Sequence, residues 1–193
     1  MFVLIKASIT PEESILQNLD TWCYEVGTRF EYMNIEAALD CINYIDDLGL
    51  DYQIADLGCG DGAATKVFHE NKFLTLAIDI NEYKLEKVPG TKICIDLLEF
   101  LESTKKLNNI FSHHAFEHII DIERAINIIG EKMNVGCLYY VIVPAGDYLH
   151  SVHHVVFESP KELLPKGFKP LKLEKQYRDE MEFICVAQKL GKE

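Results

Sequence analysis

The feature that most constrains this chain is the stretch 56–62, which reads Asp-Leu-Gly-Cys-Gly-Asp-Gly. The apolar run before it predicts a strand, and residues 63–68 after it predict a helix. Glycine lacks a Cβ atom and tolerates positive φ, so such a turn lets the backbone pass close to a ligand. The exposed N–H groups at the start of the next helix favour an anion or a strong acceptor. The stretch therefore predicts a polar, nucleotide-like ligand at a strand-to-helix turn.

Length and composition predict one globular domain over residues 1–193, because 48% of the 193 residues are apolar. Within it we expect an N-terminal helical cover over 1–50 and a ligand-binding core over 51–193. The longest late apolar run, 138–143, is too short to span a bilayer, so no membrane partner is expected. The apolar start at 1–5 meets Lys6 at once and makes a poor signal peptide.

Charge and cysteine usage narrow the function further. A net charge of −12 argues against a large nucleic-acid footprint, which needs clustered Lys and Arg. The six cysteines form no C-x-x-C pair and are expected to be small buried hydrophobes in a reducing compartment. These features predict a cytoplasmic protein with a small-molecule partner.

Apolar runs and helical patterns alternate from Tyr52 onward, which favours a mainly parallel sheet with helices on both faces. The expected strands are 53–57, 74–80, 92–95, 109–112 and 137–143. The expected helices between them are 63–70, 82–87, 97–101, 115–119 and 121–133. Two final strands, 171–176 and 182–188, are joined by so short a loop that they must be antiparallel.

Two helices are expected before the glycine turn, over 10–26 and 34–48, with Gly27 ending the first. The segment 28–32 between them is expected to be a connector or a lid.

Two kinds of nucleotide site fit the glycine turn. Gly58-x-Gly60-x-x-Ala63 satisfies the relaxed dinucleotide fingerprint of NAD-dependent dehydrogenases, and Asp79 could bind a ribose in either case. The stretch 56–62 also resembles the first motif of the class I S-adenosylmethionine-dependent methyltransferases, an acid and an apolar residue followed by G-x-G-x-G. Residues 77–80, Ala-Ile-Asp-Ile, resemble the second motif of this family, and residues 94–97, Cys-Ile-Asp-Leu, resemble the third.

The resemblance extends over residues 53–190. Residues 111–118, Phe-Ser-His-His-Ala-Phe-Glu-His, resemble the segment S-H-x-L-E-H that follows the fourth strand in small-molecule members of the family. Residues 157–168 resemble a late F-S-P-E-E-L…G-F segment. The chain departs from the family at 134–137, where Asn-Val-Gly-Cys replaces K-P-G-G. The segment between the expected strand 137–143 and Phe157 is short and leaves little room for a substrate cap, which favours a small or exposed acceptor.

The resemblance implies an α/β fold: a Rossmann-like seven-stranded methyltransferase sheet with an antiparallel C-terminal hairpin and helices on both faces. It implies S-adenosylmethionine as the cofactor and S-adenosylhomocysteine as the product. The residues implied in cofactor binding are Asp56, Gly58, Cys59, Gly60, Asp79, Ile80, Asp96, Leu97 and His113. Among them, Asp56 would orient the ammonium group, Asp79 the ribose hydroxyls and Asp96 the adenine amino group.

Six of the seven histidines fall between 113 and 154. His114, Glu117 and His118 stand at i, i+3 and i+4, so we expect them to share one helical face. Three interpretations remain open. Glu117 and His118 could be a structural pair; His118 or His154 could be a general base; or Glu117, His118 and His153 or His154 could hold a divalent metal.

We expect Glu117, His118 and His154 to act in catalysis, with methyl transfer to oxygen of a small acceptor. A metal-assisted 2′-O-methyltransferase acting on a nucleotide or sugar is a first alternative, because 154–158 faintly resembles such enzymes. A non-catalytic S-adenosylmethionine-binding regulatory or partner subunit is a second.

Overall fold

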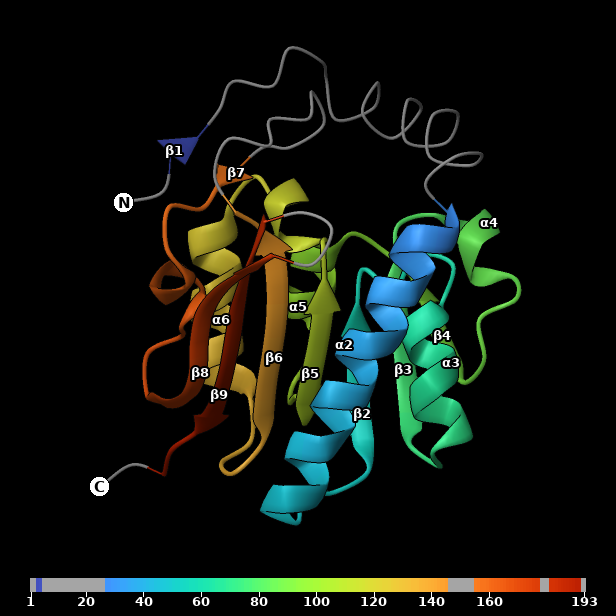
Figure 1. Cartoon of the computed structure of the whole chain (residues 1–193), viewed down its shortest axis with the longest axis horizontal. Coiled ribbons are helices and arrows are strands. Elements are labelled where there is room, and N and C mark those ends of the chain that lie inside the picture. The colour runs from blue at the N-terminus through green and yellow to red at the C-terminus, as the bar shows by residue number, and fades with distance from the viewer. Residues whose placement is uncertain (1–2, 5–26, 146–154, 178–180, 192–193) are drawn as a thin grey trace.

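The computed structural model describes residues 3–4, 27–145, 155–177 and 181–191 (Figure 1). Seven strands form one sheet in the order β4-β3-β2-β5-β6-β9-β8. Its strands are β2 (Gln53–Leu57), β3 (Leu74–Asp79), β4 (Thr91–Cys94), β5 (Asn109–His113), β6 (Leu138–Pro144), β8 (Phe168–Tyr177) and β9 (Met181–Lys189). The first five are parallel, whereas β9 runs antiparallel to both β6 and β8. The predicted sheet and its antiparallel C-terminal hairpin are confirmed.

Helices cover both faces of this sheet (Figure 1). The helices are α2 (Gly27–Leu48), α3 (Ala63–Glu70), α4 (Glu82–Leu85), α5 (Leu97–Ser103) and α6 (Ile122–Lys132), with short 3-10 turns η1 (Phe116–His118) and η2 (Pro160–Leu163). Side chains of α2 and α3 form one hydrophobic cluster with one face of the strands. The other face packs against α5, α6 and both 3-10 turns.

The central strands are buried on both faces, as crossover connections require. All seven residues of β6 and all five of β5 are buried. Side chains of β6 alternate between the two clusters, so that Tyr139 lies in one and Tyr140 in the other. The short apolar runs of the sequence are therefore core strands.

The chain changes direction across the sheet between β2 and β5. From β2 it builds outward through β3 to β4, and it then returns to β5 and builds the other half through β6. In open α/β sheets, ligands bind outside the carboxyl ends of the strands at this kind of switch point. The glycine turn follows β2 and lies there.

The start of α2 corrects one prediction. The segment 28–32 was expected to be a connector or lid, but it forms the first turns of α2, which begins at Gly27. Gly27 therefore begins a helix in place of ending one. Met33 is buried next to Ala37 on the same helix, so the apolar face extends further back than the expected start at 34. The helix predicted over 10–26 lies outside the described residues.

A second sheet has two short strands that were not predicted, β1 (Val3–Leu4) and β7 (Val155–Val156), paired antiparallel. No helix in the described parts of the chain is long and apolar enough to cross a membrane. The cysteine prediction holds in part. Cys41, Cys59 and Cys185 are buried, but Cys94 on the edge strand β4 is exposed and Cys137 is half-buried.

Candidate functional site

The glycine turn joins β2 to α3, and its three glycines have positive φ. The N–H groups of Gly58 and Cys59 donate to the Ile78 carbonyl oxygen at 2.8 and 3.0 Å, which ties the turn to β3. A methyl group at Gly58 would lie 2.3 Å from Ala115 Cβ, so this glycine is needed for packing. One at Gly60 would meet no heavy atom of the described residues within 4 Å beyond its chain neighbours. Gly60 therefore borders open space.

Asp79, at the carboxyl end of β3, has both carboxylate oxygens oriented by the backbone. Gly60 N–H donates to Oδ2 at 2.8 Å, and Asn81 N–H donates to Oδ1 at 2.9 Å. Each carboxylate oxygen has a second lone pair, so each can accept another hydrogen bond. Asp79 is half-buried and Ile80 after it is 49% exposed. An acceptor group of fixed orientation thus lies beside the open side of the glycine turn.

Asp56 is the next-to-last residue of β2, just before the turn, and is only 2% exposed. The Thr65 hydroxyl donates to its Oδ2 at 2.5 Å. Burial, opposed by the Thr65 hydrogen bond and reinforced by the charge of Asp79, raises the pKa of Asp56 to about 7. Burial likewise raises the pKa of the Cys59 thiol. The side chain of Asp56 therefore supports the first turn of α3.

Asp96 caps the next helix along the sheet. Its Oδ1 accepts the N–H groups of Leu98 and Glu99 at 2.8 and 3.1 Å at the start of α5. Asp96 is exposed, whereas Leu97 is half-buried, and its Cδ1 would lie 3.7 Å from a Cβ atom placed on Gly58. The residues predicted to hold the cofactor on β2, β3 and β4 thus gather at the carboxyl ends of these strands.

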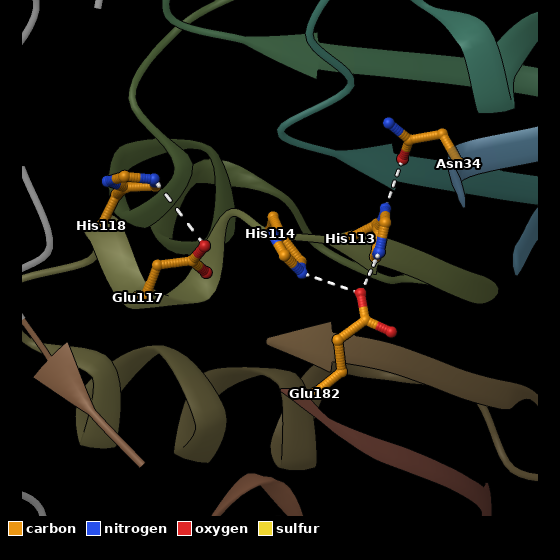
Figure 2. Close-up of polar contacts among 6 residues, drawn as sticks. All are labelled: Asn34, His113, His114, Glu117, His118 and Glu182. Carbon is orange, nitrogen blue, oxygen red and sulfur yellow. Dashed lines mark hydrogen bonds and ion pairs between the residues drawn. The ribbon is translucent and has the colours of Figure 1, made fainter. Parts of the chain in front are cut away.

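His113, the last residue of β5, faces the other way, toward α2 and β9. Its Nδ1 is 2.6 Å from Asn34 Oδ1, and its Nε2 is 3.1 Å from Glu182 Oε1 (Figure 2). Burial and the neighbouring His114 lower the pKa of His113 to about 4 against the pull of Glu182. Both ring nitrogens are engaged with the protein.

His114 contradicts the predicted helical face. Its φ is +53°, and in place of the helix expected over 115–119 the chain forms only η1, a 3-10 turn of three residues. The residue in the left-handed conformation turns its ring away from Glu117 and toward Glu182, with Nε2 3.0 Å from Oε1 (Figure 2). His114, Glu117 and His118 therefore do not share a face. Only Glu117 and His118 remain together.

Glu117 and His118 form a separate pair on η1, with Glu117 Oε1 3.8 Å from His118 Nε2 (Figure 2). The Glu117 side chain is 2% exposed and that of His118 is 31% exposed. The second carboxylate oxygen of Glu117 is buried and has no hydrogen-bond partner among the described residues. The pair combines a buried acid with an imidazole that solvent can reach. His153 and His154 lie outside the described residues.

Glu182 on β9 was missed by sequence reasoning. Its side chain is fully buried where it meets both histidines. Burial would raise its pKa, but hydrogen bonds with His113 and His114 lower it to about 2. The available signal was an acid inside the apolar run 181–187. Asn34, which was also missed, carries no such signal, because it is one polar residue of a long amphipathic helix.

No protein-family model and no curated protein matches this sequence. Solved structures do match its fold. One is 1,6-didemethyltoxoflavin-N1-methyltransferase of Burkholderia thailandensis with bound 1,6-didemethyltoxoflavin and S-adenosylhomocysteine: TM-score 0.67, 16% identity, 98% of this chain and 95% of that one.

Magnesium protoporphyrin IX methyltransferase of Synechocystis PCC 6803, with bound S-adenosylmethionine, has a TM-score of 0.64 at 13% identity, over 96% of this chain and 100% of that one. TehB of Haemophilus influenzae has a TM-score of 0.60 at 16% identity over 71% of this chain, which spans 57% of TehB. At these identities the likeness shows the fold. It is the fold of class I S-adenosylmethionine-dependent methyltransferases, as the motifs predicted.

Proposed function

We propose that this chain is an S-adenosylmethionine-dependent methyltransferase that acts on a small molecule, at oxygen. The observation that carries the proposal is the Asp79 carboxylate, held by Gly60 N–H and Asn81 N–H beside the open space at Gly60. This acceptor stands at the switch point of a methyltransferase fold, where nucleotide ligands bind. The crystal structures of two proteins with this fold contain S-adenosylmethionine or its product.

The residues present fit the cofactor. Asp79 can accept two ribose hydroxyls, and the exposed Asp96 keeps Oδ2 for an amino group while Oδ1 caps α5. Gly60 allows a ligand to lie against the backbone. Asp56, engaged with Thr65, supports the turn and can add a negative charge near an ammonium group. S-adenosylmethionine, when bound, supplies a methyl group already activated on a sulfonium sulfur.

On the acceptor side, we assign the general base to His118, with Glu117 as the acid that orients it. The ring of His118 is open to solvent on one side and within ion-pair distance of buried Glu117 on the other. An imidazole ring is suited to taking a proton from a hydroxyl group. His154 is the second candidate base. The S-H-x-L-E-H-like segment 111–118 supports placing the chain with small-molecule enzymes of this fold.

Cofactor binding is tested by titrating S-adenosylhomocysteine into the protein in a calorimeter. Asp79→Asn removes the charge but keeps one acceptor oxygen, and we expect affinity to fall roughly 10- to 100-fold, since hydrogen bonds to a charged group contribute about 1.5–3 kcal/mol. The matched control is Asp47→Asn, because Asp47 is an exposed acid near the C-terminal end of α2. Binding of NAD without S-adenosylhomocysteine binding would contradict the proposal, and equal affinities of the two variants would remove the ribose assignment.

Catalysis is tested separately, because intact cofactor motifs also fit a non-catalytic subunit. A panel of small hydroxyl-bearing acceptors is screened for acceptor-dependent release of S-adenosylhomocysteine. We expect His118→Ala to lower turnover about 10²- to 10⁴-fold while S-adenosylhomocysteine affinity stays unchanged. Full turnover in His118→Ala would move the general base elsewhere.

A further inference from the structure

A compact cluster beside the proposed cofactor site joins the ends of two strands, β5 and β9, that are far apart in sequence. His113 is the last residue of β5, His114 follows it, and Glu182 belongs to β9. Ligand atoms of all three lie within 4.8 Å of one another (Figure 2). The side chains of His113 and Glu182 are 1% and 0% exposed, and that of His114 is 11% exposed. Two fully buried ligand side chains thus converge with a third that is slightly exposed.

Proton counting shows what the contact between His113 and Glu182 requires. Asn34 Oδ1 can only accept, so the His113 nitrogen 2.6 Å away, Nδ1, carries the proton. A neutral ring then presents the lone pair of Nε2 to Glu182 Oε1, 3.1 Å away, which is an electron-pair donor as well. Two such atoms in contact repel each other unless a proton or a metal ion lies between them. A metal ion meets this need without placing a second proton on a fully buried ring.

The hydrogen bond to Asn34 is typical of a metal-binding histidine. A ligating imidazole donates its other N–H to a carbonyl or carboxylate oxygen, which fixes the tautomer and aims the lone pair at the ion. His113 has this arrangement, with Nδ1 on Asn34 and Nε2 facing the cluster. Asn34 belongs to α2, so the residue that orients the His113 ring comes from a different element than the three ligands.

The backbone of His114 is strained in a way that completes the cluster. A left-handed conformation is unfavourable for a non-glycine residue and persists only where the surroundings impose it. At His114, φ of +53° brings Nε2 to 3.0 Å from the same Glu182 oxygen that faces His113. The two rings have centroids 4.5 Å apart and planes tilted by 51°, so their nitrogens approach the oxygen from different directions.

The distances suit a small divalent ion. A tetrahedral ion with ligands at about 2.0–2.1 Å holds its donor atoms about 3.3 Å apart. The two nitrogens stand 3.1 and 3.0 Å from Glu182 Oε1, so only a few tenths of an ångström of separation are needed. Two imidazoles and one carboxylate suit Zn²⁺ and its first-row neighbours, whereas Ca²⁺ and Mg²⁺ prefer all-oxygen sites.

We propose that His113, His114 and Glu182 bind one divalent first-row transition-metal ion, with Zn²⁺ as the fitting probe, and leave a fourth coordination position unfilled by the described residues. Three protein ligands with an open fourth position are the pattern of catalytic zinc sites. If the chain is a methyltransferase, this position would take an oxygen of the acceptor; that part alone rests on the proposed function.

The test measures metal binding without S-adenosylmethionine, so its outcome is independent of cofactor binding. Full-length protein without a histidine tag is stripped with chelator and titrated with ZnCl₂ by calorimetry, and with CoCl₂ while visible absorption is followed. We expect one equivalent to bind, with cobalt bands of a tetrahedral or five-coordinate site. Glu182→Gln and His114→Ala should each weaken binding roughly a hundredfold or more. Circular dichroism checks that each variant folds.

Asn34 provides a variant outside the ligand set. Asn34→Ala should weaken Zn²⁺ binding about 10- to 100-fold, and Asn34→Asp, which keeps an acceptor for Nδ1–H, should restore most of the affinity. His69→Ala, an exposed histidine on α3, is the matched control and should bind like the wild type. The proposal is overturned if the wild type binds no Zn²⁺, or if folded Glu182→Gln and Asn34→Ala proteins bind it as tightly as the wild type.

Discussion

Two neighbouring tyrosines on β6 carry hydroxyl groups in opposite situations. Both side chains are fully buried, one on each face of the sheet. The Tyr140 hydroxyl donates to Asp40 Oδ2 on α2 at 2.7 Å. The Tyr139 hydroxyl has no hydrogen-bond partner among the described residues, and burial raises its pKa well above the ordinary value. The aromatic rings pack on both faces of the sheet. Among the described residues, a hydrogen bond compensates the loss of water for the Tyr140 hydroxyl but not for the Tyr139 hydroxyl.

The two hydroxyls predict opposite effects for the same substitution. Tyr139→Phe removes an unsatisfied buried group and should stabilise the fold by about 1 kcal/mol, since such a group costs roughly 1–3 kcal/mol. Tyr140→Phe loses the hydrogen bond to Asp40 and should destabilise by about 1 kcal/mol. Urea unfolding of the two variants and the wild type measures both. A Tyr139→Phe protein less stable than Tyr140→Phe would mean that the Tyr139 hydroxyl has a partner after all.

At the scale of elements, the glycine turn divides its work between packing and access. Gly58 lies against Ala115, the residue that precedes η1, and so ties the turn to the end of β5. Among the described residues, Gly60 has no such neighbour and faces open space. Two glycines of one motif are therefore needed for different reasons, although both have positive φ.

Three alanine substitutions separate these reasons. Gly58→Ala adds both backbone strain and a clash and should cost roughly 2–5 kcal/mol of stability. Gly60→Ala adds strain alone, about 1–2 kcal/mol, but should weaken S-adenosylhomocysteine binding because its methyl group enters the open space. Gly49→Ala, after α2, has a similar φ of +62° and no close neighbour, and serves as the control. Equal S-adenosylhomocysteine affinities of the Gly60 and Gly49 variants would exclude Gly60 from the site.

In the whole molecule, a sheet buried between two hydrophobic clusters holds a few acids away from solvent. Three acidic residues, Asp56, Glu117 and Glu182, are at most 2% exposed, although the chain as a whole is acidic. Glu182 forms hydrogen bonds with histidine side chains. The Asp56 carboxylate accepts a hydrogen bond from the Thr65 hydroxyl, and no positively charged side chain among the described residues is hydrogen-bonded to it. Ionising Asp56 therefore works against the folded state.

This predicts a pH dependence of global stability. An aspartate in the unfolded chain titrates near pH 4, whereas burial raises the pKa of Asp56 to about 7. Between these values the folded state binds more protons, so the contribution of Asp56 to stability falls as the pH rises. Relative to the wild type, Asp56→Asn should gain up to about 1.4 kcal/mol per pH unit across this window and level off above it. Urea unfolding of both proteins from about pH 5 to about pH 8 measures the difference, with Asp47→Asn as the exposed control. A constant difference would show that Asp56 ionises without penalty.

The sequence by itself determined the features that depend on near neighbours. The strand at 53–57 and the helix at 63–70 lie where the apolar pattern and the glycines placed them. The short loop before β9 required an antiparallel hairpin, because no crossover fits in so few residues. The helical face shared by His114, Glu117 and His118 was wrong, since spacing alone cannot reveal a residue with positive φ that ends the pattern.

The tertiary structure alone decided which residues meet at the end of β5. Asn34 and His113 are 79 positions apart, and His113 and Glu182 are 69 apart. Their contact depends on strand register. In the pairing of β5 with β6, His113 lies opposite Ile142, and in the pairing of β6 with β9, Pro144 lies opposite Glu182. Register follows from burying both faces of every central strand at once, a property of the assembled sheet. Local sequence therefore specified the glycine turn that holds the proposed cofactor, whereas the packed sheet created the histidine and glutamate cluster beside it.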